Sequence, residues 1–452
     1  MKLRLWSIVA LLVVTSVLVT ACGGGPAPEP TEAPAASEEE QEPAEEEPSE
    51  EEPAGTAKVS MWSHAAGNPK EIAAVEQMIA DFNGMQEDYE IVLESFPQES
   101  YNDSVQGAAI AGDLPCILDL DGPTVPNFAW SEYIQPLPVS EEELDEIGII
   151  PQDVGRYKGT VYSLGQFDVA LLIYGRKSVL EKYDIRIPTL DEPWTKEEFD
   201  EILKTLQDSG EFEYALDVNA GWTGEWWPYA MGPMLWSFGG SMIDRDTYLT
   251  AEGILNGPEA QAWGEWFHDL FEKGYVNPNP ADIEGFNQGR VALWYNGSWS
   301  ADPATEAWGD DLLFLPAVDF GEGPKIGAGS WQWAISATCE ESEGAWEFIS
   351  YMMEPEQIAL MSETTALIPT TPDGAALTET FQEGGKYRIF YDMLDRFAMV
   401  RPRTPAYLTI SSEFEQAATL IRDGGNVLDA LDDAVDAIER DIEDNDGYGF
   451  EE

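Results

Sequence analysis

The sequence predicts an α/β protein with two lobes, and three observations lead to this prediction. Segments with the apolar pattern of β-strands alternate along the chain with segments that carry apolar residues at helical spacing. The roughly 400 residues that follow Gly55 are too many for one simple hydrophobic core. No repeat of fixed period is found, which argues against a solenoid. We therefore expect α/β lobes built on mostly parallel sheets.

The first element is predicted to be a lipoprotein signal peptide at residues 1–21. Lys2 and Arg4 form a short basic region, and the apolar run at residues 5–19 is too short to span a membrane comfortably. Residues 19–22 read Val-Thr-Ala-Cys, which fits a lipobox, so Cys22 is expected to carry acyl chains. This anchor would hold the protein on the extracytoplasmic side of the cell membrane. The alternative is an ordinary signal peptide that happens to end near a cysteine.

Residues 22–56 are predicted to be a disordered acidic tether behind the lipidated cysteine. Between Cys22 and Gly55 the segment contains Pro, Ala, Ser and twelve Glu, with no Lys, no Arg and no aromatic residue. Such a composition cannot bury enough apolar surface to offset the entropy of ordering. Like charges and prolines extend the segment, which could hold the folded part up to ~100 Å from the bilayer.

The folded part then alternates strands and helices. A helix is expected where Asn68 precedes Pro69, because proline suits the first helical position. Thr195 and Glu198 form a capping box at the start of another helix. Further helices are predicted to begin at Pro258 and Asn426. Strands are predicted at residues 58–62, 90–95, 116–120, 169–174, 290–295 and 331–336.

Charge and composition limit the function classes. The net charge of −63 should repel nucleic acid and anionic lipid headgroups, so no nucleic-acid partner is expected. This excess of carboxylates indicates either adaptation to salty or acidic surroundings or a cationic ligand. The chain contains only two His, which is too few for a histidine-built metal centre and makes a Ser-His-Asp arrangement improbable. We expect no metal and no cofactor. Cys116 and Cys339 could pair in an oxidising compartment, which the sequence leaves open.

Local motifs, in their order along the chain, carry a resemblance to a known family. The motifs are MWSH at 61–64, AGDLP at 111–115, DVALLIYGRK at 168–177, GFNQGRVAL at 285–293, NGSW at 296–299, LP at 315–316, and the segments 327–336, 343–351 and 401–407. Together they resemble the family 1 extracellular solute-binding proteins, relatives of maltose-binding protein, from Lys58 to about Asp441. Two positions depart from the pattern, because Cys116 replaces a usual Asp and Gly175 a usual Asn.

The resemblance implies a two-lobed, periplasmic-binding-protein-like fold of type II, with a ligand cleft between the lobes. The implied hinge crossings are near residues 166–169, 316–319 and 368–371. The implied lobes are 57–167 plus 318–369 at the N-terminal side, and 168–317 plus 370–452 at the C-terminal side. The lobes would close on a small sugar and present it, as a monomer, to the transmembrane subunits of an ABC permease. No reaction is expected.

The candidate ligand-binding residues combine flat rings with fixed polar groups, as a sugar requires. Some lie where strands end, which is the usual ligand position in open α/β sheets. Others belong to the tryptophan-rich segment 221–229, or match the family's stacking position at Trp299 and its late aromatic contact at Tyr407. The predicted site is Trp62, Ser63, His64, Asp121, Asp168, Trp222, Trp226, Trp227, Trp299, Ser330, Trp331, Arg403 and Tyr407.

Two other functions remain open at this point. A binding protein for a cationic solute such as a polyamine would also use aromatic walls and carboxylates, through cation–π contacts. Several unpaired carboxylates in the site would favour the cation, whereas one or two with amides would favour a sugar. A surface glycoside hydrolase would need two carboxylates about 5–10 Å apart, one of them with a raised pKa.

Overall fold

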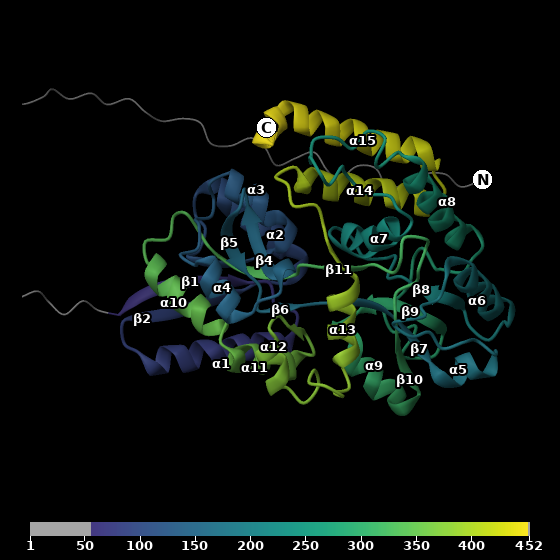
Figure 1. Ribbon diagram of the computed structural model, residues 1–452, viewed down its shortest axis with the longest axis horizontal. Helices are drawn as coiled ribbons and strands as arrows, with labels where there is room; N and C mark the ends of the chain where they lie inside the picture. Colours follow the sequence, from purple (N-terminus) through teal and green to yellow (C-terminus); the bar gives the residue numbers. More distant parts are fainter. Residues whose placement is uncertain (1–55, 451–452) are drawn as a thin grey trace, which may run out of the picture. The chain divides into compact units, whose positions relative to one another are not determined.

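A computed structural model describes residues 56–450 of the chain (Figure 1). The predicted signal peptide, the lipidation site at Cys22 and nearly all of the predicted tether lie outside the described residues. Within the described part, no helix combines the length and the apolar character that crossing a membrane requires.

The first sheet contains six strands in the order β2-β1-β3-β12-β5-β4. The strands are β1 (Ala57–Ser63), β2 (Tyr89–Ser95), β3 (Ile117–Asp121), β12 (Trp331–Ile335), β5 (Thr160–Leu164) and β4 (Val154–Tyr157). Strand β3 lies between β1 and β12 and is buried along its whole length, as its apolar run predicts. The helices in these segments are α1 (Pro69–Met85), α2 (Gln98–Ala111), α3 (Val125–Trp130), α4 (Glu141–Ile147), α10 (Ser342–Met352) and α11 (Pro355–Thr365). Of these, α1 packs against β2, α10 and α11.

The second sheet contains four strands in the order β10-β7-β9-β8. They are β10 (Leu312–Leu315), β7 (Leu171–Arg176), β9 (Val291–Gly297) and β8 (Tyr214–Asp217). Both β7 and β9 are buried at every residue, which explains their continuous apolar sequences. The flanking helices are α5 (Lys177–Lys182), α6 (Lys196–Asp208) and α9 (Ala301–Trp308).

Four helices pack together beside the second sheet (Figure 1). They are α7 (Trp226–Ser237), α8 (Pro258–Glu272), α14 (Tyr407–Arg422) and α15 (Val427–Asp444). The predicted helix starts are confirmed: Pro69 and Pro258 occupy first-turn positions, and Asn68 and Asn426 are the N-caps of α1 and α15. The capping box of Thr195 and Glu198 at α6 is also confirmed.

Two short strand pairs lie outside the main sheets. Strand β6 (Phe167–Asp168) pairs with β13 (Ile368–Pro369), and β11 (Ile326–Ala328) pairs with β14 (Ala398–Val400). The helices α12 (Pro372–Leu377) and α13 (Arg388–Phe397) connect β13 to β14. The β6–β13 pair therefore joins the segments predicted to be the first and third hinge crossings. The division of the chain into two lobes stays a prediction.

The prediction of mostly parallel sheets is wrong. Strand β1 runs parallel to β2 and β3, and β8 runs parallel to β9, whereas the other pairs of the two sheets are antiparallel. One cause is local: Lys158 and Gly159 both have positive φ, which makes the two-residue turn that folds β4 and β5 into a hairpin. The other is topological, because β12 enters the first sheet against the direction of β3 long after that strand is complete.

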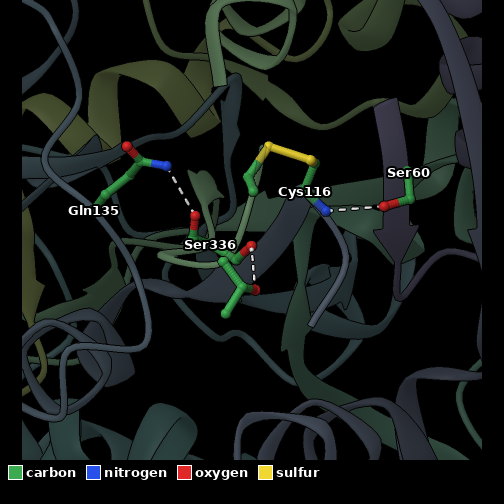
Figure 2. The surroundings of a disulfide bond; sticks show 6 residues. Ser60, Cys116, Gln135 and Ser336 are labelled. Atoms are coloured by element: carbon green, nitrogen blue, oxygen red, sulfur yellow. Dashed lines mark hydrogen bonds between the residues drawn. A yellow bond between two sulfur atoms is a disulfide. The ribbon is translucent and has the colours of Figure 1, made fainter. Parts of the chain in front are cut away.

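A disulfide joins Cys116 to Cys339 and settles the pairing that the sequence leaves open (Figure 2). Cys116 directly precedes β3, and Cys339 follows β12, so the bond crosslinks two neighbouring antiparallel strands. The Cα atoms are 4.5 Å apart, within the range that a disulfide can bridge. Hydrogen bonds hold the same corner: Ser336 N donates to Cys116 O at 2.9 Å, and Cys116 N donates to Ser60 Oγ at 3.0 Å.

Candidate functional site

The centre of the candidate site is the buried guanidinium of Arg401, just after β14. Its Nη1 and Nη2 atoms bind the two carboxylate oxygens of Asp121 at 2.7 and 2.6 Å. Nη1 also binds Oε1 of Glu225 at 2.5 Å, and Nη2 donates to the carbonyl of Gly329 at 2.9 Å. Asp121 ends β3, and Glu225 is the residue directly before α7. One side chain therefore connects the first sheet to the four-helix layer.

Glu225 is held from a second direction by the start of α14. Tyr407 donates its hydroxyl proton to Oε1 of Glu225, and Ser411 donates to Oε2 at 2.6 Å. Burial raises the pKa of Glu225, although the guanidinium of Arg401 acts in the opposite direction. Burial and the neighbouring carboxylate of Glu225 raise the pKa of Tyr407, so this residue stays a neutral hydrogen-bond donor.

Gly329 lets the backbone approach this centre closely. Its φ is +76°, and an added Cβ would lie 3.2 Å from the carbonyl oxygen of Gln152, so another residue would be strained here. Its N–H donates to Oδ2 of Asp168 at 3.3 Å, and the other Asp168 oxygen accepts from the N–H of Val169 at 2.7 Å. The turn thus fixes Asp168 next to the carbonyl that Arg401 binds.

A second buried carboxyl group, Asp153, lies close enough to Asp168 for each to affect the titration of the other. Burial raises the pKa of Asp168 to about 6. Burial, followed by repulsion from Asp168, raises the pKa of Asp153 well above its usual range. Among the described residues neither side-chain oxygen of Asp153 has a hydrogen-bond partner. The pair therefore retains a proton at pH values where exposed aspartates are ionised.

An aromatic cluster formed by α7, the segment before it and the segment after β9 lies beside the same centre. Trp299 follows β9, and its ring folds back over Gly297, where an added Cβ would lie 1.9 Å from Cζ3 of the indole. The ring centroid of Trp299 is 6.3 Å from those of both Trp226 and Tyr229. The guanidinium carbon of Arg401 lies 5.0 Å from the centroid of Tyr229. Trp222 extends the cluster, 4.6 Å from Trp226.

Aromatic rings also line the first sheet near Asp121. Trp331 is the residue opposite Asp121 in the β3–β12 pairing, and its ring stacks on His64 at 3.9 Å with an interplanar angle of 11°. Trp62 packs on Phe96, with ring centroids 4.7 Å apart, and belongs to the same cluster of partly buried rings. Trp299 and Trp331 both remain partly exposed, so each could offer a ring face to a ligand.

His64, a predicted ligand contact, has carboxylates of the protein at both ring nitrogens. Its Nδ1 is 2.6 Å from Asp119, and its Nε2 is 3.3 Å from Glu71, so both ring nitrogens are occupied by buried carboxylates. Burial disfavours the charged imidazole, but the carboxylates of Asp119 and Glu71 outweigh it and raise the pKa of His64. The side chain supports the ring of Trp331 and leaves no nitrogen for a ligand.

Two other predicted contacts, Trp227 and Ser63, have partners within the protein. Trp227 is fully buried, donates Nε1 to the carbonyl of Trp222 at 2.9 Å and packs edge-to-face on Phe267, which makes it a core residue. The hydroxyl of Ser63 accepts from the N–H of Ala65 at 3.2 Å and stabilises the turn after β1. The tryptophan-rich segment thus contributes both to the hydrophobic core, through Trp227, and to the aromatic cluster at the candidate site, through Trp226, which packs against Trp299.

The remaining predicted residues lie around the same centre. Ser330 follows Gly329, is buried, and accepts the N–H of Gly122 at 2.9 Å through its carbonyl. Arg403 donates Nη2 to the carbonyl of Gln152 at 2.7 Å. The structure brings the following predicted residues to one region: Asp121, Asp168, Trp222, Trp226, Trp299, Ser330, Trp331, Arg403 and Tyr407.

Sequence reasoning missed the two residues that organise this region. Glu225 lies inside the tryptophan-rich segment that was singled out, but a lone carboxylate there carries no signal among so many acidic residues. Arg401 lies two residues before the predicted Arg403, and its role depends on partners 280 and 176 residues away. Within residues 56–450, no group of three or more His, Cys, Asp or Glu side chains is placed to hold a metal ion.

Comparison with known protein families gives the class of the molecule. The profile described as bacterial extracellular solute-binding protein matches residues 77–388, which is more than half of the chain. The chain belongs to this family. Its members bind solutes for ABC transport and are not enzymes, so both the predicted family and the predicted non-enzymatic role are confirmed.

Solved structures show that the fold is the periplasmic-binding-protein-like α/β fold that was predicted. The cyclic α-maltosyl-1,6-maltose binding protein of Arthrobacter globiformis has a TM-score of 0.70 at 22% identity, covering 86% of this chain and 100% of that one. The GacH receptor of Streptomyces glaucescens also has a TM-score of 0.70, at 19% identity, covering 86% and 99%. A maltose/maltodextrin-binding domain of Bdellovibrio bacteriovorus has a TM-score of 0.68 at 17% identity, covering 86% and 100%.

Proposed function

We propose that this protein is the extracytoplasmic substrate-binding component of an ABC importer and that its ligand is a sugar or an oligosaccharide. The observation that carries the proposal is the arrangement around Arg401. The partly exposed rings of Trp222 and Trp299 pack on Trp226, the residue after Glu225. The partly exposed Trp331 lies opposite Asp121 in the β3–β12 pairing, and Arg401 fixes both carboxylates. Flat rings suit the apolar C–H faces of a sugar, and fixed carboxylates suit its hydroxyl groups.

The state of the carboxylates favours a sugar over a polyamine. Asp121 and Glu225 are both bound to Arg401, and Glu225 also accepts two hydroxyl hydrogen bonds. Asp119 is bound to His64. Asp153 and Asp168 have no cationic partner among the described residues, but their raised pKa values keep a proton on this pair. A site for a polyamine would instead need several carboxylates without cationic partners, because the ligand itself has to neutralise them. The solved structures described above include proteins whose names state that they bind maltose-type saccharides, which agrees with this choice.

In the proposed cycle the ligand binds between the two predicted lobes, and their closure favours delivery to the transmembrane subunits of the permease. Arg401 is suited to this cycle, since it joins Asp121 at the end of the first sheet to Glu225 on α7. Lipidation of Cys22 would keep the protein near the permease, with residues 22–56 as the tether.

Binding can be tested on the purified full-length protein by thermal shift and calorimetric titration. The ligands would be neutral mono- and oligosaccharides, polyamines and amino acids. A ligand that binds only the folded state stabilises it by about 2.7 kcal/mol at a hundredfold excess over Kd. We expect a shift with saccharides that high salt does not remove. A salt-sensitive shift with polyamines alone would contradict the sugar assignment.

The site assignment is tested with the saccharide found in that screen. Trp299→Ala removes a ring that is partly exposed beside the polar centre, so it should weaken binding by about tenfold or more while the protein stays folded. Trp130→Ala is a matched control, because Trp130 is 38% exposed and packs on Tyr448 instead. Unchanged affinity in folded Trp299→Ala would exclude this ring from the site.

A further inference from the structure

Two arginines near the candidate site differ from most others in the chain. Within residues 56–450, seven arginines form ion pairs with carboxylates, as expected in a protein with a net charge of −63. Arg245 and Arg403, like Arg176 and Arg440 elsewhere in this part of the chain, have no carboxylate at ion-pair distance. Both side chains are partly buried, so their charges are only partly solvated.

Both guanidinium groups are fixed beside the Gly329 turn. Nη2 of Arg245 donates to the carbonyl of Val400 at 2.7 Å, and Nη2 of Arg403 donates to the carbonyl of Gln152 at 2.7 Å. An added Cβ on Gly329 would lie 3.2 Å from that Gln152 oxygen and 3.4 Å from Cγ1 of Val400. The two anchoring carbonyls therefore belong to segments that meet at the turn whose own carbonyl binds Arg401.

Arg245 has an unused hydrogen-bond donor beside the candidate site. The side-chain atom Nη1 of Arg245 is buried and has no hydrogen-bond partner among the described residues. The side chain is held in place by Trp236, whose ring centroid is 5.4 Å from its guanidinium carbon. A guanidinium is always charged and presents a rigid fork of donors, so a buried unpaired N–H in such a group is costly unless an acceptor arrives.

The electrostatics near Arg403 also lack a compensating anion. Burial lowers the pKa of Arg403, and repulsion from Arg245 and Arg156 contributes to this lowering. Asp153 acts in the opposite direction, but it forms no ion pair with Arg403, and burial together with Asp168 raises the pKa of Asp153. Arg156 is already neutralised by Glu141, at 2.6 and 2.8 Å. Two cationic groups thus repel each other where the protein supplies no ionised carboxylate in contact.

We propose that Arg245 and Arg403 form a subsite for an anionic group of the ligand, a uronate carboxylate or a sulfate ester on a saccharide. The inference rests on the proposed function and specifies its substrate class. Guanidinium groups bind planar oxyanions through paired, charge-assisted hydrogen bonds. The net charge of the protein repels free anions at long range, and such a local pair of arginines offsets that repulsion at the site.

The test compares trigalacturonate with its neutral methyl ester and with a sulfated trisaccharide, by calorimetric titration of the full-length protein. The wild-type protein should bind the carboxylate or the sulfate form at least about tenfold more tightly than the ester. The Arg245→Gln/Arg403→Gln double variant should lose this preference, because its affinity for the acid falls by a larger factor than its affinity for the ester. Arg440→Gln makes the same change of charge per residue on the exposed side of α15 and should keep the preference.

The outcomes separate this inference from the proposed function. Equal binding of the acid and the ester by the wild-type protein, or binding of neutral saccharides alone, would overturn the anion subsite and leave the sugar-binding function standing. If the affinity of the double variant fell by the same factor for the acid and the ester, the two arginines would only position the backbone at Val400 and Gln152. That result would also overturn the subsite. Tighter binding of the sulfated form than of the uronate would assign the subsite to sulfate esters. Failure of every saccharide, charged or neutral, would overturn the proposed function itself.

Discussion

Asp121 and Glu225 come from distant parts of the chain and face one guanidinium, that of Arg401, in a buried position. The side chain of Arg401 is 2% exposed, and that of Asp121 is 8% exposed. Bringing such charges out of water is costly, and only their mutual contacts compensate for it. The stability of the protein and the geometry of the site therefore depend on the same ion pairs.

Replacing Arg401 should be far more costly than replacing an arginine of a surface ion pair. Arg401→Gln leaves two carboxylates without their cation and should reduce the free energy of unfolding by about 3–5 kcal/mol. Arg396→Gln removes an exposed pair with Asp191 and should cost only about 0–1 kcal/mol. Urea denaturation of both variants measures the difference. Similar losses would show that the Arg401 network contributes no more than a surface pair.

Asp153 and Asp168 give a pH dependence with a defined sign. Their folded-state pKa values are raised, so above about pH 4 the unfolded chain releases protons that the native state keeps. This contribution to stability is therefore complete below the unfolded pKa and is lost as the pH rises through about 6, the folded-state pKa of Asp168. Asp153→Asn should make the decrease in Tm between about pH 4 and 7 less steep.

The measurement is the difference in Tm between the variant and the wild-type protein at each pH, because other carboxylates titrate in both. Asp433→Asn, at an exposed position on α15, controls for the change in net charge. Parallel Tm profiles for Asp153→Asn and the wild-type protein would show that the two buried carboxyl groups do not titrate as proposed.

At the scale of residues, the sequence predicts which kinds of side chain form the site better than it predicts which of these side chains contact one another. Trp299, Asp121 and Tyr407 can be selected because rings and polar groups at strand ends and loops suit a sugar. The roles of Arg401 and Glu225 depend on contacts across 280 and 176 residues, which local pattern does not encode. His64 can also be selected from the sequence as a ligand contact. Its partners Asp119 and Glu71 reach the ring nitrogens only once the sheet has formed, so the sequence does not predict these contacts.

At the scale of elements, local signals predict where helices and strands begin but not how strands are ordered. Proline at position 69 and the capping box at Thr195 act within one turn of helix, so they can be read directly. The place of β12 between β3 and β5 results from long-range packing, and it makes the first sheet mixed. The hairpin turn at Lys158 and Gly159 was available as a signal for antiparallel pairing.

The Cys116–Cys339 bond should stabilise the contact between β3 and β12. The bond links residues 223 positions apart. In the chain-entropy description, a disulfide that closes a longer loop removes more conformational entropy from the unfolded chain. The Cys116→Ser/Cys339→Ser double variant should lose about 2–5 kcal/mol of unfolding free energy in urea. Ligand affinity should be unchanged, because Asp121 lies at the other end of β3.

Wild-type protein treated with a reductant is the control for the double variant, since it loses the bond without changing the sequence. The two should unfold at the same urea concentration. Equal stability of the oxidised, reduced and double-variant proteins would mean that the hydrogen bonds of Ser336 and Cys116 already hold the corner without the disulfide.

At the scale of the whole molecule, net charge acts on every element at once. The chain carries 86 acidic residues against 23 Lys and Arg, so carboxylates far outnumber the cations that could neutralise them. On α15, Asp433, Asp436 and Glu443 are all exposed along one helix. Self-repulsion of this kind destabilises the compact state, and the unfolded chain relieves it by expanding.

Salt should therefore raise the Tm of the full-length protein more than it does for a chain of balanced charge. The Debye length falls from about 30 Å at 0.01 M to about 10 Å at 0.1 M salt, so most of the rise should come at low concentration. The Asp433→Asn/Asp436→Asn/Glu443→Gln variant removes three exposed charges from α15 and should melt higher than the wild-type protein at low salt, with a smaller response to NaCl. Thermal scans across this range measure both effects. A Tm that does not depend on salt would show that the acidic surface is solvated without measurable repulsion, whereas a rise confined to molar salt would point to excluded-solute stabilisation instead of screening.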